Sequence, residues 1–375
     1  MFVNRALISV AAANDSGFLE RTPSGDPMSP NQLTFVARGV DLCVKNLSVH
    51  LLRAERARVQ RGEIAWGSWQ VMNNRLNAHI LPLLGDVSIK LIDTQRAQEL
   101  VDRLGAEGFS STTIAQYLVL LRKLLAHAVL MGILKEVPAL PRVKVRSQPR
   151  GAFSVDEYRR MVSVARALRG EPHPVLAGLG KGDRFWIARE LLFMPDELPW
   201  LIRWMVNTFV RPSDIKEVKH GHIDVVRGRH VYLRMRLPET KRHSQPMVSL
   251  RAGVRVYEAL LTHQRQRGFG GPNDYLFLPH VKDRGQALAI LNFFFKWVLD
   301  TAGLSVGPLG QKRTLYCLRH TAITLRLLYG QGIDMLTLAR NARTSVNMIE
   351  RFYASTLSGE MNVGLLQSRR GRKEP

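Results

Sequence analysis

The sequence LYCLRHTAITLRLLYG, residues 315–330, places Arg319 and His320 side by side inside an apolar segment with helical periodicity. We expect this segment to form a buried helix that begins near a cap at Thr314. A buried cation is costly unless an anion or a dense set of acceptors surrounds it. Arg319 is therefore expected either to bind an anion or to be satisfied by main-chain carbonyl groups.

The charge balance indicates a polyanionic partner. The 375 residues include 54 Lys and Arg against 31 Asp and Glu, which gives a net charge of +23 at pH 7. Self-repulsion of this size destabilises a compact chain unless a polyanion neutralises it. Nucleic acid is therefore the leading partner, and a generically basic protein is the alternative.

The sequence favours a cytoplasmic, nucleoid-associated location without a membrane partner. Cys43 and Cys317 are too few for a disulfide framework or a four-cysteine zinc site, which indicates a reducing compartment. The short apolar run ALISVAAA, residues 6–13, has flanks that fit a signal peptide poorly. The apolar run LPWLIRWMVNTFV is interrupted by Arg203 and Asn207, and we expect no stretch to reach the length of a membrane span.

The first half of the chain predicts a helical domain between two irregular segments. Residues 1–30, rich in Ser, Gly, Pro and Asp, are predicted to be a flexible N-terminus. Within residues 31–138, helices are predicted over 68–85, 91–104 and 112–132 from the spacing of their apolar residues. Residues 139–151 are basic and contain two prolines, so we expect a linker that can lie along phosphates.

The second half, residues 152–356, predicts a mainly α fold with a small antiparallel β-sheet. HVYLRMRL, residues 230–237, alternates apolar and polar side chains as a half-buried strand does. HIDVV, residues 222–226, and MVSL, residues 247–250, are predicted to be its partners, and the intervening PETKRHSQP turns the chain. Residues 357–375 form a basic C-terminal tail.

Four residues of this second domain are candidates for catalysis: Arg211, Lys241, Arg319 and Tyr353. Each also has a structural interpretation without catalysis. In that interpretation Arg211 pairs with Asp214 and Lys241 points into solvent. Arg319 is bound by main-chain carbonyls, and Tyr353 packs in the core. Taken together they suit one reaction. Two guanidinium groups can hold the non-bridging oxygens of a phosphodiester, an ammonium can protonate the leaving 5′ oxygen, and a phenolate can attack phosphorus. Fixed cations then do the electrostatic work without a metal.

The order of an arginine, a hairpin lysine, LRHT at 318–321 and a tyrosine within TSVNMIERFY at 344–353 resembles the tyrosine recombinases, the phage-integrase class of site-specific recombinases. The resemblance implies that residues 31–138 are a core-binding (SAM-like) DNA-binding domain and residues 152–356 the catalytic domain. It implies that Arg211, Arg319 and Lys241 act on a phosphate of double-stranded DNA and that Tyr353 forms a 3′-phosphotyrosyl intermediate.

The same resemblance implies an assembly and a biological setting. Four protomers are expected to act on two DNA sites, and the C-terminal tail is expected to dock on a neighbour. No cofactor is expected, and neither ATP nor a metal is required. An integrase of a mobile genetic element is the expected role, with an accessory directionality factor as a further partner.

The sequence departs from the family pattern at three positions. Tyr316 replaces a usual histidine, and Thr344 replaces a usual histidine or tryptophan, so help in deprotonating Tyr353 is expected from His320 instead. Arg343 stands where the family usually has glycine, and we expect it either to contact a phosphate or to disturb a tight turn.

Two other functions fit the same residues. A recombinase relative that binds DNA without cleaving it and a type IB topoisomerase are the alternatives to an active recombinase. His220 and His222 would share one face of a strand, but no third ligand is evident, so no metal site is expected.

Overall fold

The computed structural model divides the chain into two compact units, Met1–Ser147 and Gln148–Pro375, each with its own hydrophobic core. The boundary between the units, after Ser147, falls within residues 139–151, where we expect a linker from the sequence. For Phe352 and Tyr353 the structure describes the backbone alone. The predicted N-terminal segment 1–30 and the tail 357–375 lie outside the described residues, which are 42–145, 151–180, 182–238, 245–330 and 332–353.

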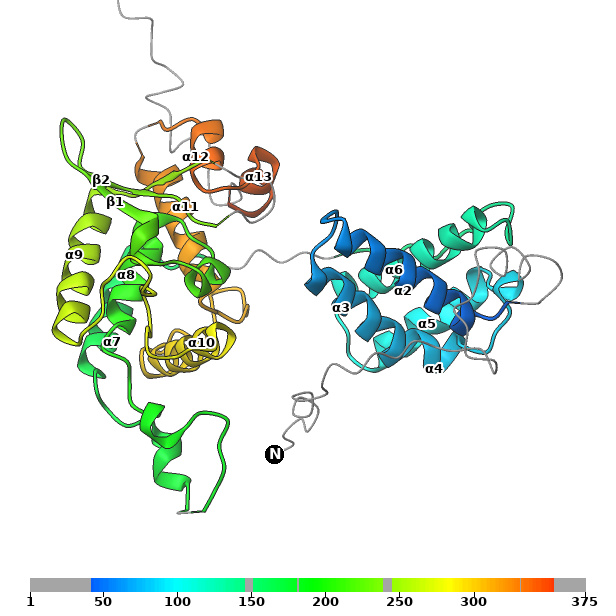
Figure 1. The fold of residues 1–375 in the computed structure, drawn as a ribbon, viewed down its shortest axis with the longest axis horizontal. Coiled ribbons are helices and arrows are strands. Elements are labelled where there is room, and N and C mark those ends of the chain that lie inside the picture. The colour runs from blue at the N-terminus through cyan, green and yellow to red at the C-terminus, as the bar shows by residue number, and fades with distance from the viewer. Residues whose placement is uncertain (1–41, 146–150, 181, 239–244, 331, 354–375) are drawn as a thin grey trace, which may run out of the picture. The chain divides into compact units, whose positions relative to one another are not determined.

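Unit 1 is a helical bundle (Figure 1). Its elements are α2 (Val44–Gln60), α3 (Trp66–Arg75), the π-helix η1 (Leu76–Ile80), α4 (Leu81–Leu84), the 3-10 helix η2 (Ile89–Leu91), α5 (Thr94–Ala106) and α6 (Ser111–Leu130). The helix predicted over 68–85 is therefore present but contains a wider turn at η1. The helix predicted from residue 91 begins at Thr94, because the Asp93 carboxylate caps it by accepting a hydrogen bond from the amide of Arg96.

Helix α6 corrects one expectation from the sequence. Its 20 residues are long and apolar enough to cross a membrane by length and composition, although no such stretch was expected. In the structure Leu121, Leu124 and Leu125 of this helix are fully buried in the core of unit 1. The hydrophobic face of α6 is thus covered by the other helices of this unit, and its N-terminus is capped by Ser110.

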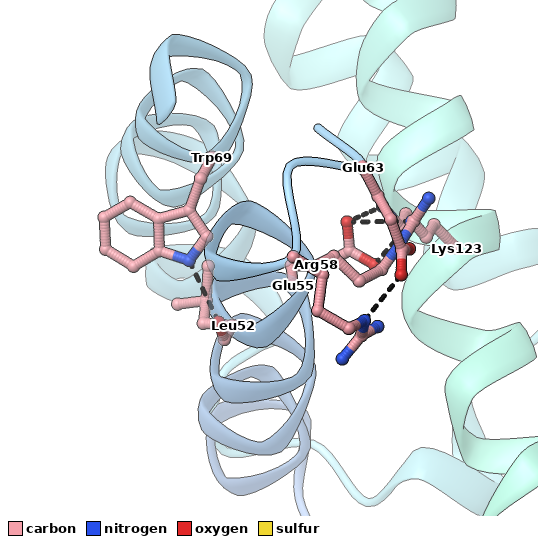
Figure 2. A network of polar contacts seen from close by, with 7 residues as sticks. Leu52, Glu55, Arg58, Glu63, Trp69 and Lys123 are labelled. Carbon is pink, nitrogen blue, oxygen red and sulfur yellow. Dashed lines mark hydrogen bonds and ion pairs between the residues drawn. The ribbon is translucent and has the colours of Figure 1, made fainter. Parts of the chain in front are cut away.

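A buried carboxylate joins α2 to α6 (Figure 2). Glu55, 4% exposed, accepts a hydrogen bond from Arg58 at 3.1 Å and another from Lys123 on α6. Burial alone would raise the pKa of Glu55, but the hydrogen bonds and charges of Lys123 and Arg58 outweigh it and lower that pKa. Arg58 also pairs with Glu63 at 2.8 Å, and the Trp69 indole donates to the carbonyl of Leu52.

Unit 2 is mainly helical with one small sheet, which confirms the predicted fold class (Figure 1). Its α-helices are α7 (Val155–Ala167), α8 (Leu198–Thr208), α9 (Arg251–Gln266), α10 (Arg284–Thr301), α11 (Tyr316–Tyr329), α12 (Met335–Asn341) and α13 (Val346–Tyr353). Its 3-10 helices are η3 (Pro174–Gly178), η4 (Arg189–Leu191), η5 (Pro212–Lys216) and η6 (His220–His222). Its strands are β1 (Ile223–Val226), β2 (Tyr232–Met235) and β3 (Met247–Val248).

The sheet has the order β1-β2-β3 with antiparallel neighbours. Leu233 and Met235 of β2 are fully buried, so the alternating pattern in the sequence is confirmed, although the strands are shorter than predicted. α9 packs against both β2 and α8, which places the sheet at the edge of the helical core.

The two histidines of this region do not lie on a strand, which corrects a sequence expectation. His220 and His222 belong to the short helix η6, and the ring of His220 is buried between Tyr257 (3.2 Å) and Gln264 (2.6 Å). Within the described ranges, no group of three potential metal-ligating side chains is found. His220 therefore serves the packing of α9 against η6.

The first residues of unit 2 are tied to α11. Glu157 of α7 accepts two hydrogen bonds of 2.9 Å from the buried guanidinium of Arg313, which lies over the ring of Phe153. The amide of Phe153 donates to the hydroxyl of Thr321 at 2.9 Å. These contacts fix the segment just before α11 to α7.

Candidate active site

Helix α11 brings Arg319 into the core of unit 2. The helix begins at Tyr316 and is preceded by Leu315, so the predicted cap at Thr314 is wrong. Instead the carbonyl of Thr314 accepts a 2.8 Å hydrogen bond from the amide of Cys317 and the Thr314 amide contacts the Cys317 sulfur. α11 packs against α8 and α13, and Arg319 on its first turns is only 2% exposed.

The guanidinium of Arg319 is held by main-chain carbonyl groups from two distant parts of the chain. Its Nη1 donates to the carbonyl of Phe209, and its Nη2 donates to the carbonyl of Ala342. Phe209 ends α8 with a left-handed backbone (φ 60°), which breaks the helix at this point. The acceptors are those expected for a buried arginine satisfied by carbonyl oxygens.

Arg211 follows two residues after Phe209 and is the residue before η5. Its amide donates to the buried carboxylate of Asp214 at 2.8 Å, while its Nη2 donates to the carbonyl of Arg343. Arg211 thus contacts Asp214, as predicted, but through its main-chain amide. The Arg211 guanidinium is directed at the carbonyl of Arg343 instead. Asp214 fixes the backbone from which the Arg211 side chain extends.

The two arginines therefore meet at consecutive carbonyl groups, those of Ala342 and Arg343. These residues form the turn that ends α12. The amide of Arg343 donates to Arg340 at 3.0 Å and that of Thr344 to Ala339 at 2.9 Å, the hydrogen-bond pattern of a Schellman motif. Its left-handed position is usually glycine, and here it is Arg343 with φ 51°.

The side chain of Arg343 is buried, 2% exposed, and its Nη2 donates to the carbonyl of Pro238 at 3.1 Å. The turn is retained with arginine in place of glycine, so the expected disturbance of the turn is not observed. Arg343 instead connects this turn to the chain just beyond β2.

Asn341, the last residue of α12, makes a contact with Val248 that the sequence did not reveal. Its Oδ1 accepts from the amide of Val248 at 2.7 Å, and its Nδ2 donates to the carbonyl of the same residue at 3.0 Å. This double hydrogen bond pairs the amide side chain with the edge of β3 as a neighbouring strand would. The partners are 93 residues apart in sequence, so no local pattern could have indicated it.

The remaining candidates lie around the same turn. The rings of Tyr316 and His320, one helical turn apart on α11, lie 5.2 Å apart, and His320 is buried. Thr344 is half-buried directly after Arg343. A neutral imidazole can accept a proton, whereas the hydroxyl groups of Tyr316 and Thr344 are poor acceptors at neutral pH.

Two of the four predicted catalytic residues cannot be placed in full. Lys241 lies outside the described residues. Tyr353 ends α13, which begins two residues after Thr344 and packs against α11 and α12, but its side chain is outside the described part of the structure. The structure therefore brings together Arg211, Arg319 and the helix that carries Tyr353.

The fold is that of the tyrosine recombinases, as the sequence resemblance predicts. The integrase of the transposon Tn1549, in complex with transposon right-end DNA, superposes with a TM-score of 0.60 at 14% identity over 87% of this chain and 99% of that chain. A lambda integrase tetramer bound to a Holliday junction gives 0.60 at 15% identity over 88% and 82%. A lambda integrase dimer on a COC′ core site gives 0.56 at 16% identity over 94% and 84%.

No protein-family model and no curated protein matches the sequence. At the identities given above, the likeness to the integrases establishes the fold of this chain.

Proposed function

We propose that this protein is a site-specific DNA recombinase, an integrase that cleaves and rejoins DNA through a tyrosine. The observation that carries the proposal is the convergence of the Arg211 and Arg319 guanidinium groups on consecutive carbonyls of one turn, beside the helix that bears Tyr353. The net charge of +23 supports a nucleic-acid substrate.

The first step is capture of the scissile phosphate by the two arginines. A phosphate is a charged acceptor and binds guanidinium N–H groups more strongly than a neutral carbonyl does. It can therefore share or replace the contacts that Arg211 and Arg319 make with Ala342 and Arg343. Since both side chains are already ordered around one turn, little rotamer entropy is lost when the phosphate binds.

The second step is cleavage. The phenol oxygen of Tyr353 attacks phosphorus, and its proton passes to His320, the buried imidazole one residue after Arg319. The bond from phosphorus to the 5′ oxygen breaks, and Lys241 donates the proton that this oxygen takes. The products are a 3′-phosphotyrosyl link and a free 5′ hydroxyl, so the phosphodiester energy is retained and no ATP is consumed.

Rejoining is the reverse reaction with a different 5′ hydroxyl, which requires two DNA sites in one assembly. The solved relatives include an integrase with circular-intermediate DNA and a tetramer on a Holliday junction. We extend these properties to this chain as a homotetramer on double-stranded DNA that serves a mobile genetic element in the cytoplasm. Unit 1 would be the core-binding domain, and an accessory directionality factor would bias the outcome.

A nicked suicide substrate tests this function. Wild-type protein should form a covalent protein–DNA adduct, because the short fragment beyond the nick diffuses away and prevents rejoining. Tyr353→Phe should abolish the adduct while leaving DNA affinity nearly unchanged, and Tyr329→Phe on the exposed end of α11 is the matched control. An adduct that persists in Tyr353→Phe would reject Tyr353 as the nucleophile.

A DNA-binding relative without cleavage is the second candidate. It is favoured by one observation: Tyr316 stands where the family usually has a histidine and Thr344 where it usually has a histidine or tryptophan, and both are poor proton acceptors. This candidate predicts tight DNA binding by the wild type without any adduct. A type IB topoisomerase would instead relax supercoiled DNA that lacks a specific site, so a relaxation assay on unrelated plasmid separates it from both.

A further inference from the structure

We propose that Asn341 and Arg343 are positioning residues that hold both ends of the β2–β3 connection against the catalytic turn, and so place the general acid of the cleavage step. This rests on the proposed recombinase function. The sequence leads us to expect that Arg343 either contacts a phosphate or disturbs a tight turn, and it gives Asn341 no role. The geometry assigns both residues to the hairpin that contains Lys241.

Arg343 holds the segment that leaves β2 at Pro238, which we call the first leg of the connection; the segment that enters β3 at Val248 is the second leg. The carbonyl of Pro238, three residues beyond the end of β2, accepts the 3.1 Å hydrogen bond from the Arg343 guanidinium. Pro238 is also three residues before Lys241 in the sequence. The donor is buried, so the contact is shielded from water and is stronger than an exposed one would be.

The second leg is held by Asn341. Its amide makes two hydrogen bonds, of 2.7 and 3.0 Å, to the main chain of Val248 on β3. Val248 is also paired with Arg234 of β2 through the sheet. The returning leg is thus fixed on both sides, by β2 and by the end of α12.

The two contacts come from residues that flank Ala342, whose carbonyl accepts from Arg319. The carbonyl of Arg343 accepts from Arg211. One three-residue turn therefore joins both catalytic arginines to both legs of the hairpin. A displacement of the hairpin relative to the arginines would require one of these hydrogen bonds to break.

The backbone of Arg343 supports a selected role for its side chain. A left-handed conformation at φ 51° disfavours any residue with a Cβ atom, and glycine would relieve this strain. Arginine at this position costs free energy that its contact with Pro238 offsets. The Arg343 side chain is buried, and the hydrogen bond from its Nη2 to the carbonyl of Pro238 joins it to the chain that leaves β2.

A change of leaving group tests the proposal. One substrate carries the natural 5′ oxygen at the scissile phosphate, and the other carries a bridging sulfur there. A thiolate leaves without a proton because a thiol is far more acidic than an alcohol. Loss of the general acid, or of its placement, should therefore slow cleavage of the oxygen substrate only. The variants are Arg343→Gly, which keeps the turn, Asn341→Ala, and Lys241→Ala as the reference for lost general acid.

Lys241→Ala should slow the oxygen substrate by about 10²-fold or more, the usual contribution of a general acid. Arg343→Gly and Asn341→Ala should each slow it by about tenfold, and all three should cleave the sulfur substrate within about threefold of wild type. Arg340→Ala removes an exposed guanidinium from the same helix and should cleave both substrates as wild type does. Equal losses on the two substrates in Arg343→Gly and Asn341→Ala would overturn the proposal.

A readout without DNA separates this proposal from the recombinase function. Hydrogen exchange at the Val248 amide should be slow in wild type and accelerate at least tenfold in Asn341→Ala, because its acceptor is removed. Fast exchange of this amide in wild type would overturn the positioning role whether or not the protein cleaves DNA. A wild type that protects the amide but forms no adduct would reject the recombinase function alone.

Discussion

Arg211 donates a hydrogen bond to the main-chain carbonyl of Arg343, 132 residues further along the chain. The neighbouring carbonyl of Ala342 accepts from Arg319. One turn of backbone therefore orients both guanidinium groups that we propose to bind the scissile phosphate.

Replacing Arg211 with lysine should impair cleavage far more than DNA binding. Lysine keeps the charge but lacks the planar fork that can donate to the Arg343 carbonyl and to a phosphate in fixed geometry. We expect the cleavage rate to fall by about 10²-fold or more, the usual loss when an oxyanion donor is removed. Single-turnover cleavage and filter binding on one substrate measure the two effects. An unchanged cleavage rate would show that Arg211 does not contact the phosphate.

Arg343→Gly should be more stable than Arg343→Ala. Both variants lose the hydrogen bond to Pro238, but only alanine retains the left-handed strain at φ 51°. The difference should be about 1 kcal/mol, which corresponds to a shift in Tm of about 2–4 °C for a domain of this size. Thermal unfolding monitored by circular dichroism measures it. Equal Tm values would indicate that the turn relaxes when the side chain is removed.

The Glu157–Arg313 pair predicts a loss of stability in acid. Burial alone would raise the pKa of Glu157, but the hydrogen bonds from Arg313 and from the Ser154 amide, with the charge of Arg313, lower it on balance. Because the folded-state pKa lies below the unfolded one, the pair stabilises the fold fully above the ordinary glutamate value of about 4.3. That contribution is lost as the pH falls through the folded-state pKa.

Urea unfolding between pH 7 and pH 3 measures this dependence, with Glu157→Gln as the comparison. The variant should be less stable than wild type at pH 7 and approach it in acid, because its amide does not titrate. A constant difference between the two proteins across this range would show that the Glu157 carboxylate is not the titrating group.

Glu55→Gln should loosen the packing of α2 against α6 in unit 1. The change removes a buried negative charge from Lys123 and Arg58, both of which are more than one-third exposed and can be solvated instead (Figure 2). We expect a loss of about 1–3 kcal/mol, seen as faster hydrogen exchange in α2 and α6. Arg159→Gln, which breaks the exposed pair with Asp156, should have no measurable effect. A Glu55→Gln protein with unchanged exchange would contradict a structural role for the network.

Local signals in the sequence predicted much of the fold. Ser110 and Ser154 cap α6 and α7, and the alternation around Leu233 and Met235 marks β2. Such features depend on residues within a few positions of one another. The sequence did not predict that α6 is long and apolar enough to span a membrane, because Arg122 and Lys123 interrupt its apolar run.

The acceptors at the candidate site could not be predicted in this way. The carbonyls of Phe209 and Ala342 have no sequence signature, and the contact between Asn341 and Val248 joins segments that meet only in the folded chain. The left-handed conformation of Arg343 was also unexpected, because a residue with a Cβ atom rarely adopts it. The resemblance identified the four candidate residues, and the structure shows what holds Arg211 and Arg319.

The most direct test is to isolate the covalent adduct on a nicked substrate, digest the DNA and the protein, and locate the nucleotide by mass spectrometry. We predict that the peptide containing Tyr353 carries a nucleotide joined to the phenol oxygen through its 3′ phosphate, and that Arg211→Lys lowers the yield of this peptide. A nucleotide on any other residue, or a wild-type protein that binds its site without ever yielding this peptide, would contradict the proposed mechanism.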